Sequence, residues 1–81
     1  MTRAEMEVYK DKKPIAVYPM SNWGGVEILD VQYGIEDYAI ARYNFGKAED
    51  KVHRVKIKYS ADSAYIRLDG NQIRLDECMR V

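Results

Sequence analysis

The sequence predicts a mainly antiparallel all-β domain, built as a small barrel or a strongly twisted sheet of about five to seven short strands. Two observations carry this prediction. Apolar and basic residues alternate with period two through residues 55–59, 65–68 and 73–75, as in strands with one buried face, and turn-forming residues separate these stretches. The 81 residues are enough for one small domain, so we expect residues 1–81 to form a single unit with a modest core.

Residues 52–76 form the clearest segment and are predicted to be a three-stranded meander. Asp69 and Gly70 make a favoured two-residue hairpin turn because both positions tolerate a positive φ, and residues 60–63 make the turn before it. The resulting register pairs Leu68 with Asn71, Arg67 with Gln72, Ile66 with Ile73, Tyr65 with Arg74, Tyr59 with Ala64, Ile57 with Ile66 and Val55 with Leu68. It gathers the aliphatic side chains on one face, and a shift by one residue would break that pattern.

The middle of the chain is predicted to contain three more strands. Residues 25–33 and 37–45 are rich in β-branched and aromatic residues, and a tight connection at 34–36 joins them. Their apolar residues fall on both parities, which suits strongly bent strands. Residues 15–18 form a short strand between two prolines, since proline is found at the edges of strands.

The first dozen residues allow either a strand or a short helix. Thr2 and Glu5 have the spacing of a helix capping box, whereas residues 6–9 alternate like a strand. With the charged residues 10–13 as a turn, we favour the strand.

The composition favours a cytoplasmic protein. Cys78 is the only cysteine, so an internal disulfide cannot form, and small secreted domains usually depend on disulfides. No apolar run approaches the roughly 20 residues of a membrane helix, and residues 1–7 lack the apolar centre of a secretion signal. We therefore expect no membrane partner, and stability that comes from packing or, alternatively, from packing and a homodimer.

The sequence carries no pattern typical of an enzyme, a metal site or a cofactor site. His53 is the only histidine; it falls on the inward parity near a strand end, where we expect a partly buried side chain and no catalytic base. A zinc site needs about four suitable ligands, and the acidic pairs at 36–37 and 49–50 lack the spacing of a calcium loop. We expect a non-enzymatic domain without catalytic, cofactor-binding or metal-binding residues.

The outer face of the meander is a candidate surface for an anionic partner. Its candidate residues are Lys56, Lys58, Tyr65, Arg67 and Arg74. The predicted register sets Lys58, Tyr65 and Arg74 in one cross-strand row, Lys56, Arg67 and Gln72 in the next, and Arg54 opposite Asp69. Cations beside an aromatic ring could follow a phosphate backbone while a base stacks on the ring, or could dock on an acidic protein. The alternative is a solvated sheet face, which needs polar residues in any case.

A second candidate surface is aromatic. Trp23 lies in a polar, glycine-containing loop; it would contact a partner, as tryptophans at interfaces often do, or cover one end of the core. Tyr33, Tyr38 and Tyr43 lie in the acidic stretch 21–50. Those that face outward would form a patch for a partner protein.

In size and composition the chain is similar to many small accessory proteins of bacteriophages and mobile elements. That resemblance implies action by binding, often as an inhibitor of a host enzyme or defence protein. The first hypothesis is therefore a non-enzymatic protein-binding module or inhibitor. The alternative is a nucleic-acid or nucleotide binder that uses the basic face of the meander.

Overall fold

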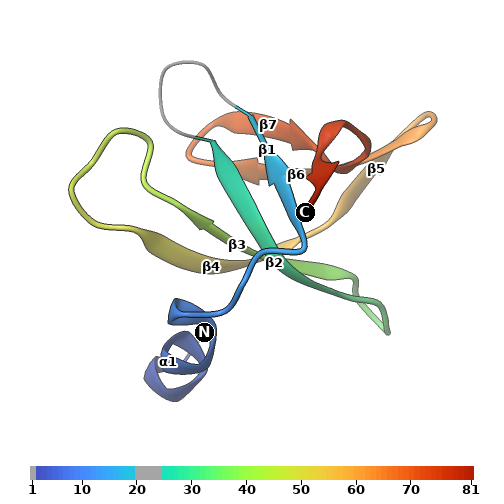
Figure 1. Ribbon diagram of the computed structural model, residues 1–81. Coiled ribbons are helices and arrows are strands. Elements are labelled where there is room, and N and C mark those ends of the chain that lie inside the picture. Colours follow the sequence, from blue (N-terminus) through green and yellow to red (C-terminus); the bar gives the residue numbers. More distant parts are fainter. Residues whose placement is uncertain (1, 20–24) are drawn as a thin grey trace.

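The computed structural model describes residues 2–19 and 25–81, which form two antiparallel sheets and one short helix (Figure 1). The elements are α1 (Arg3–Lys10), β1 (Ala16–Tyr18), β2 (Val26–Gln32), β3 (Tyr38–Tyr43), β4 (Lys51–Lys56), β5 (Lys58–Ser60), β6 (Ser63–Leu68), β7 (Asn71–Arg74), the 3₁₀ helix η1 (Leu75–Glu77) and β8 (Met79–Arg80). One sheet has the order β4-β3-β2-β1-β8 and the other β5-β6-β7. The mainly antiparallel β prediction is confirmed, and the described strands do not close into a barrel.

The main core lies between the two sheets. The five-stranded sheet contributes Val26, Ile28, Ala39, Ala41 and Tyr43, all buried. The three-stranded sheet and the junction before it contribute Ile57, Ile66, Leu68 and Ile73. Burying these side chains is the main favourable term in folding, because it removes apolar surface from water.

A β-bulge gives the five-stranded sheet a second, smaller core on its other face. Ile28 pairs with Ala41, but the next pair is Asp30 with Ile40, so Leu29 is an extra residue in β2. Leu29 packs with Ile40 and Val52, and Tyr9 of α1 covers them. The bulge explains why apolar residues of β2 fall on both parities.

The N-terminal residues form a helix, so the preference for a strand there is wrong. The Thr2 side chain caps this helix, because the Glu5 N–H donates to Thr2 Oγ1 at 3.2 Å and the Thr2 hydroxyl donates to Glu5 Oε1 at 3.1 Å. Alternation over only four residues is a weaker signal than a satisfied helix cap. No helix in the described ranges is both long and apolar enough to cross a bilayer.

The C-terminal hairpin has the predicted register. Its turn residues Asp69 and Gly70 have φ of 49° and 83°, as the predicted turn requires. The confirmed pairs are Leu68 with Asn71, Arg67 with Gln72, Ile66 with Ile73, Tyr65 with Arg74 and, across the preceding turn, Tyr59 with Ala64.

The first strand of the meander divides at Ile57, which the sequence did not predict. Residues 51–56 pair with β3, so Val55 lies opposite Ala39 instead of Leu68, and the ladder to β6 starts only at Lys58. The Ile57 N–H donates to the Asp37 carbonyl at 2.8 Å, and the side chain is buried at the junction. A bend keeps the period-two pattern intact, so alternation alone does not reveal it.

Candidate functional site

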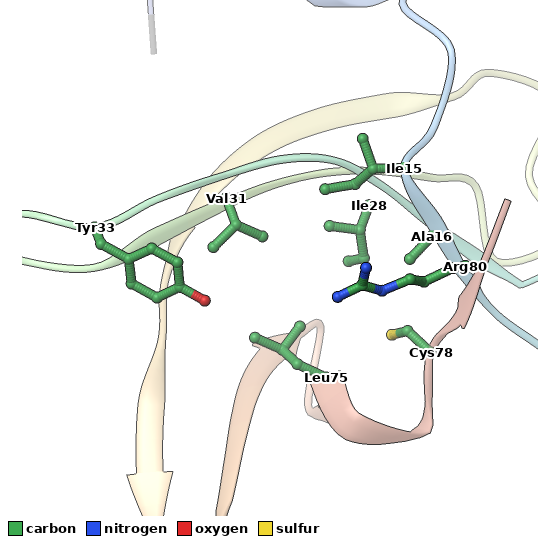
Figure 2. Close-up of a pocket in the computed structure, with 8 residues that line it drawn as sticks. All are labelled: Ile15, Ala16, Ile28, Val31, Tyr33, Leu75, Cys78 and Arg80. Atoms are coloured by element: carbon green, nitrogen blue, oxygen red, sulfur yellow. The ribbon is translucent and has the colours of Figure 1, made fainter.

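An apolar groove of about 370 Å³ opens beside the path from β7 to β8 (Figure 2). One wall belongs to the five-stranded sheet and the segment before it, and consists of Ile15, Ala16, Ile28, Val31 and Tyr33. The other wall consists of Leu75 in η1, Cys78 directly after η1, and Arg80 in β8, the edge strand of the five-stranded sheet. This volume is near the lower end for sites that bind small molecules, so the groove can take one or a few side chains of a partner.

Arg80 determines the electrostatics of the groove. It pairs with Ala16 in the sheet, which directs its side chain to the groove face. Figure 2 shows the guanidinium in the middle of the groove, between Ile28 and Leu75. None of the described carboxylates forms an ion pair with Arg80, whereas Arg42 and Arg74 each have an acidic partner.

Beyond the groove lining, exposed apolar side chains lie on the turn between β2 and β3 and on β5, which Asp37 joins. Tyr33 is 74% exposed, Ile35 106% and Tyr59 62%. The groove lining together with Ile35 and Tyr59 is called the groove surface below. Tyr33 is common to both parts, because its ring points into the groove in Figure 2.

Asp37 holds this turn in place. Its carboxylate accepts hydrogen bonds from the Gly34 N–H at 3.2 Å and from the Tyr59 hydroxyl. The hydrogen bond to Asp37 raises the pKa of Tyr59 to about 12, since it favours the protonated phenol. The turn that carries Ile35 is therefore anchored to β5 and presents a preformed surface.

Cys78 contributes apolar lining. Burial, followed by the nearby charges of Asp76 and Glu77, raises the pKa of the thiol. A thiol with a raised pKa carries little thiolate at neutral pH and is a poor nucleophile. Its role in the groove is packing.

The structure divides the predicted basic face. Lys58, Tyr65 and Arg74 lie in one cross-strand row, as predicted. Lys56 lies in the other sheet opposite Tyr38, so its predicted row with Arg67 and Gln72 is wrong. Arg54 lies opposite Ile40, so its predicted position opposite Asp69 is wrong as well. Both errors follow from the division of the strand at Ile57.

Ion pairs reduce the charge that this face offers to a partner. Arg74 contacts Asp76 at 2.9 Å and Glu77 at 3.2 Å. Lys56 lies 4.0 Å from Glu36. Of the four candidate cations, Lys58 and Arg67 have no acidic partner among the described residues.

The predicted aromatic residues lie in different environments. Tyr33 is on the groove surface, Tyr38 is half-buried and donates its hydroxyl hydrogen to Glu36 at 2.5 Å, and Tyr43 is buried in the main core. Trp23 lies outside the described residues. Tyr33 is therefore the one predicted protein-contact residue that the structure places at the groove.

His53 lies on the core-facing parity but is exposed, so its predicted partial burial is wrong. Its strand, β4, is an edge strand of the five-stranded sheet, so one side of the imidazole ring faces solvent. The ring still contacts Tyr43, whose hydroxyl lies 2.9 Å from His53 Nδ1. Within the described ranges, no group of three or more His, Cys, Asp or Glu residues could hold a metal ion.

Most of the groove surface could not be found from the sequence. Ile15, Leu75 and Arg80 come together only through the pairing of β8 with β1, which local patterns do not reveal. Tyr59 was expected on the inner face with Ile57; it does lie opposite Ala64, which packs against the main core, but its side chain is exposed and its hydroxyl reaches Asp37. Ile35 carried no clear signal, because a single apolar residue in an exposed turn is normal.

Comparison with known proteins gives no match to any family model, curated protein or solved structure. The fold and the site define the class of the molecule. It is a small antiparallel β domain with an open apolar groove.

Proposed function

We propose that the protein is a non-enzymatic binding module that docks on another protein through the groove surface. The observation that carries this proposal is the clustering of exposed apolar side chains around one groove. Among the described residues eight large hydrophobic side chains are exposed; Ile15 and Tyr33 line the groove, and Ile35 and Tyr59 belong to the segments that Asp37 joins next to Tyr33. Clustered exposed apolar groups are typical of interaction sites.

The composition of the surface suits protein recognition. Tyr33 and Tyr59 offer large apolar rings with polar tips, and tyrosine is enriched among the residues that dominate binding energy. Covering apolar surface contributes about 25 cal/mol per Å² before the costs of association. Those costs are lowered here, because Asp37 already holds the turn that carries Ile35.

The charges favour a protein partner over nucleic acid. A phosphate backbone would have to compete with Asp76 and Glu77 for Arg74, and Lys56 lies in a different sheet from the other candidate cations. A module of this kind acts by occupying a surface of its partner, as an accessory or inhibitory protein does.

The test is capture of partners by tagged protein from a bacterial lysate, with and without nuclease and across a salt series. The groove variant Tyr33→Ser/Ile35→Ser changes two exposed residues, and Val8→Ser on α1 is the matched control, since Val8 is also exposed. We expect a discrete protein that survives nuclease and moderate salt, is kept by the control and is lost by the groove variant. Release by nuclease, or equal capture by both variants, would contradict the proposal. A thermal melt of each variant shows that the fold is intact.

A further inference from the structure

We propose that the groove recognises the C-terminal residue of a partner protein when that residue is apolar, and that Arg80 binds its free carboxylate. This inference rests on the proposed function, because it assigns the chemistry of the segment that the docking surface takes. Its two parts, an apolar side chain and a carboxylate, follow from the two kinds of group that line the groove.

The walls select an apolar side chain. Ile28 and Leu75 face one another across the groove in Figure 2, and Val31 and Tyr33 lie at its far end. Ile28 is buried, and Val31 and Leu75 pack against the main core. The walls are therefore supported from behind, which favours a preformed site.

Arg80 requires an anion. A purely apolar occupant would cover the guanidinium and leave a desolvated charge without a partner, which is strongly unfavourable. No described carboxylate pairs with Arg80, and the nearby acids Asp76 and Glu77 are already bound to Arg74. A carboxylate in the groove would compensate the charge and can form the bidentate hydrogen bonds that guanidinium groups favour.

The small size of the groove favours a chain terminus over an internal acidic residue. In an extended peptide, neighbouring side chains point to opposite faces, so an apolar residue and an adjacent Asp or Glu would not enter the groove together. A C-terminal residue carries its carboxylate on the same Cα as its side chain. Both groups then fit within about 370 Å³ beside Arg80, in the manner of known sites that capture C-terminal carboxylates.

The experiment titrates ¹⁵N-labelled full chain with small probes and follows its NMR spectrum. The probes are N-acetyl-leucine, which has the free carboxylate, N-acetyl-leucinamide, which lacks it, and acetate, which lacks the apolar side chain. We expect N-acetyl-leucine to shift the Arg80 Nε–H signal and the amide signals of Val31 and Cys78, with a Kd on the order of millimolar. Binding of the amide and of acetate should be at least about tenfold weaker.

Two arginine variants complete the test. Arg80→Gln should remove the preference for the acid over the amide, while Arg67→Gln, an exposed arginine without an acidic partner among the described residues, should leave it unchanged. Equal binding of acid and amide by the wild-type protein would overturn the role of Arg80 and leave the docking proposal standing. If neither leucine probe shifts the groove signals, the inference is wrong. The docking proposal fails separately, when Tyr33→Ser/Ile35→Ser still captures the partner.

Discussion

The Tyr59 hydroxyl donates a hydrogen bond to the carboxylate of Asp37, which precedes it by 22 residues. Tyr59 belongs to the three-stranded sheet, and Asp37 immediately precedes β3 of the five-stranded sheet. The bond therefore connects the two sheets at the same place where the groove surface extends onto the β2–β3 turn.

Tyr59 should ionise at unusually high pH. Its pKa is raised from 10.0 to about 12 by the hydrogen bond to Asp37. Because the folded state holds this proton more tightly, the stabilisation is complete below about pH 10 and is lost as the pH rises towards 12. A titration of tyrosinate absorbance should show a component near pH 12 that Tyr59→Phe removes and Tyr65→Phe keeps. Persistence of that component in Tyr59→Phe would show that another tyrosine is responsible.

Arg42→Gln should destabilise the protein by about 1–3 kcal/mol, measured by urea unfolding. The Arg42 side chain is only 13% exposed and forms two hydrogen bonds of 3.0 Å with Glu27. It also donates to the Lys10 carbonyl at 2.8 Å, which attaches the end of α1 to the sheet. The control is Arg54→Gln, whose pair with Glu5 is exposed at 3.7 Å and should cost about 0.5 kcal/mol or less. If the two substitutions lowered the free energy of unfolding equally, burial of the Arg42–Glu27 pair would make no extra contribution to stability.

Ile66→Ala should cost about 2–5 kcal/mol in the free energy of unfolding. Ile66 is fully buried in the main core and pairs with Ile73, so the truncation leaves a cavity. This loss is a large part of the total free energy of unfolding, which is roughly 5–15 kcal/mol for a small domain. Val8→Ala, at a 70% exposed position, should stay within about 0.5 kcal/mol. A small loss for Ile66→Ala would argue against the packing described.

Two glycine substitutions should have opposite signs. Gly70 has φ of 83°, and a methyl group added there would meet open space, so Gly70→Ala should cost about 1–2 kcal/mol through backbone strain alone. Gly34 has no positive φ, and an added Cβ would meet only the Glu36 carbonyl oxygen at 4.0 Å. Gly34→Ala should therefore stabilise by about 0.4–1 kcal/mol, because it restricts the unfolded chain. Thermal melts of the two variants give the comparison, and a stabilising Gly70→Ala would contradict the assigned turn.

Local patterns predicted those parts of the fold that local chemistry determines. The Asp69-Gly70 turn fixes the β6–β7 register, because a two-residue turn leaves no freedom in the pairing. The Thr2 and Glu5 cap was visible in the sequence, but the short alternation after it was given more weight. The bulge at Leu29 and the division at Ile57 depend on packing against segments that are distant in the sequence. Local sequence patterns therefore do not predict them.

The candidate site was harder to predict than the fold. Tyr33 was singled out because an aromatic residue in an acidic stretch stands out in the sequence. Arg80 could not be identified from the sequence, because only the fold places it among the apolar residues of β1 and η1 that line the groove. Tyr59 has the parity of a core residue and pairs with the core-packed Ala64, so nothing in its sequence position indicated that its side chain would be exposed.

The continuous chain from β4 to β5 has a consequence for cooperativity. Since one run of residues belongs to both sheets, and Ile57 at its centre is buried and hydrogen-bonded to Asp37, neither sheet can melt without loosening the other. The groove has one wall on the five-stranded sheet and the other on η1, which packs on β6, so a half-folded chain contains no groove. Any molecule that fills it binds the native state alone, and will raise the melting temperature by an amount that grows with the logarithm of its concentration relative to its Kd.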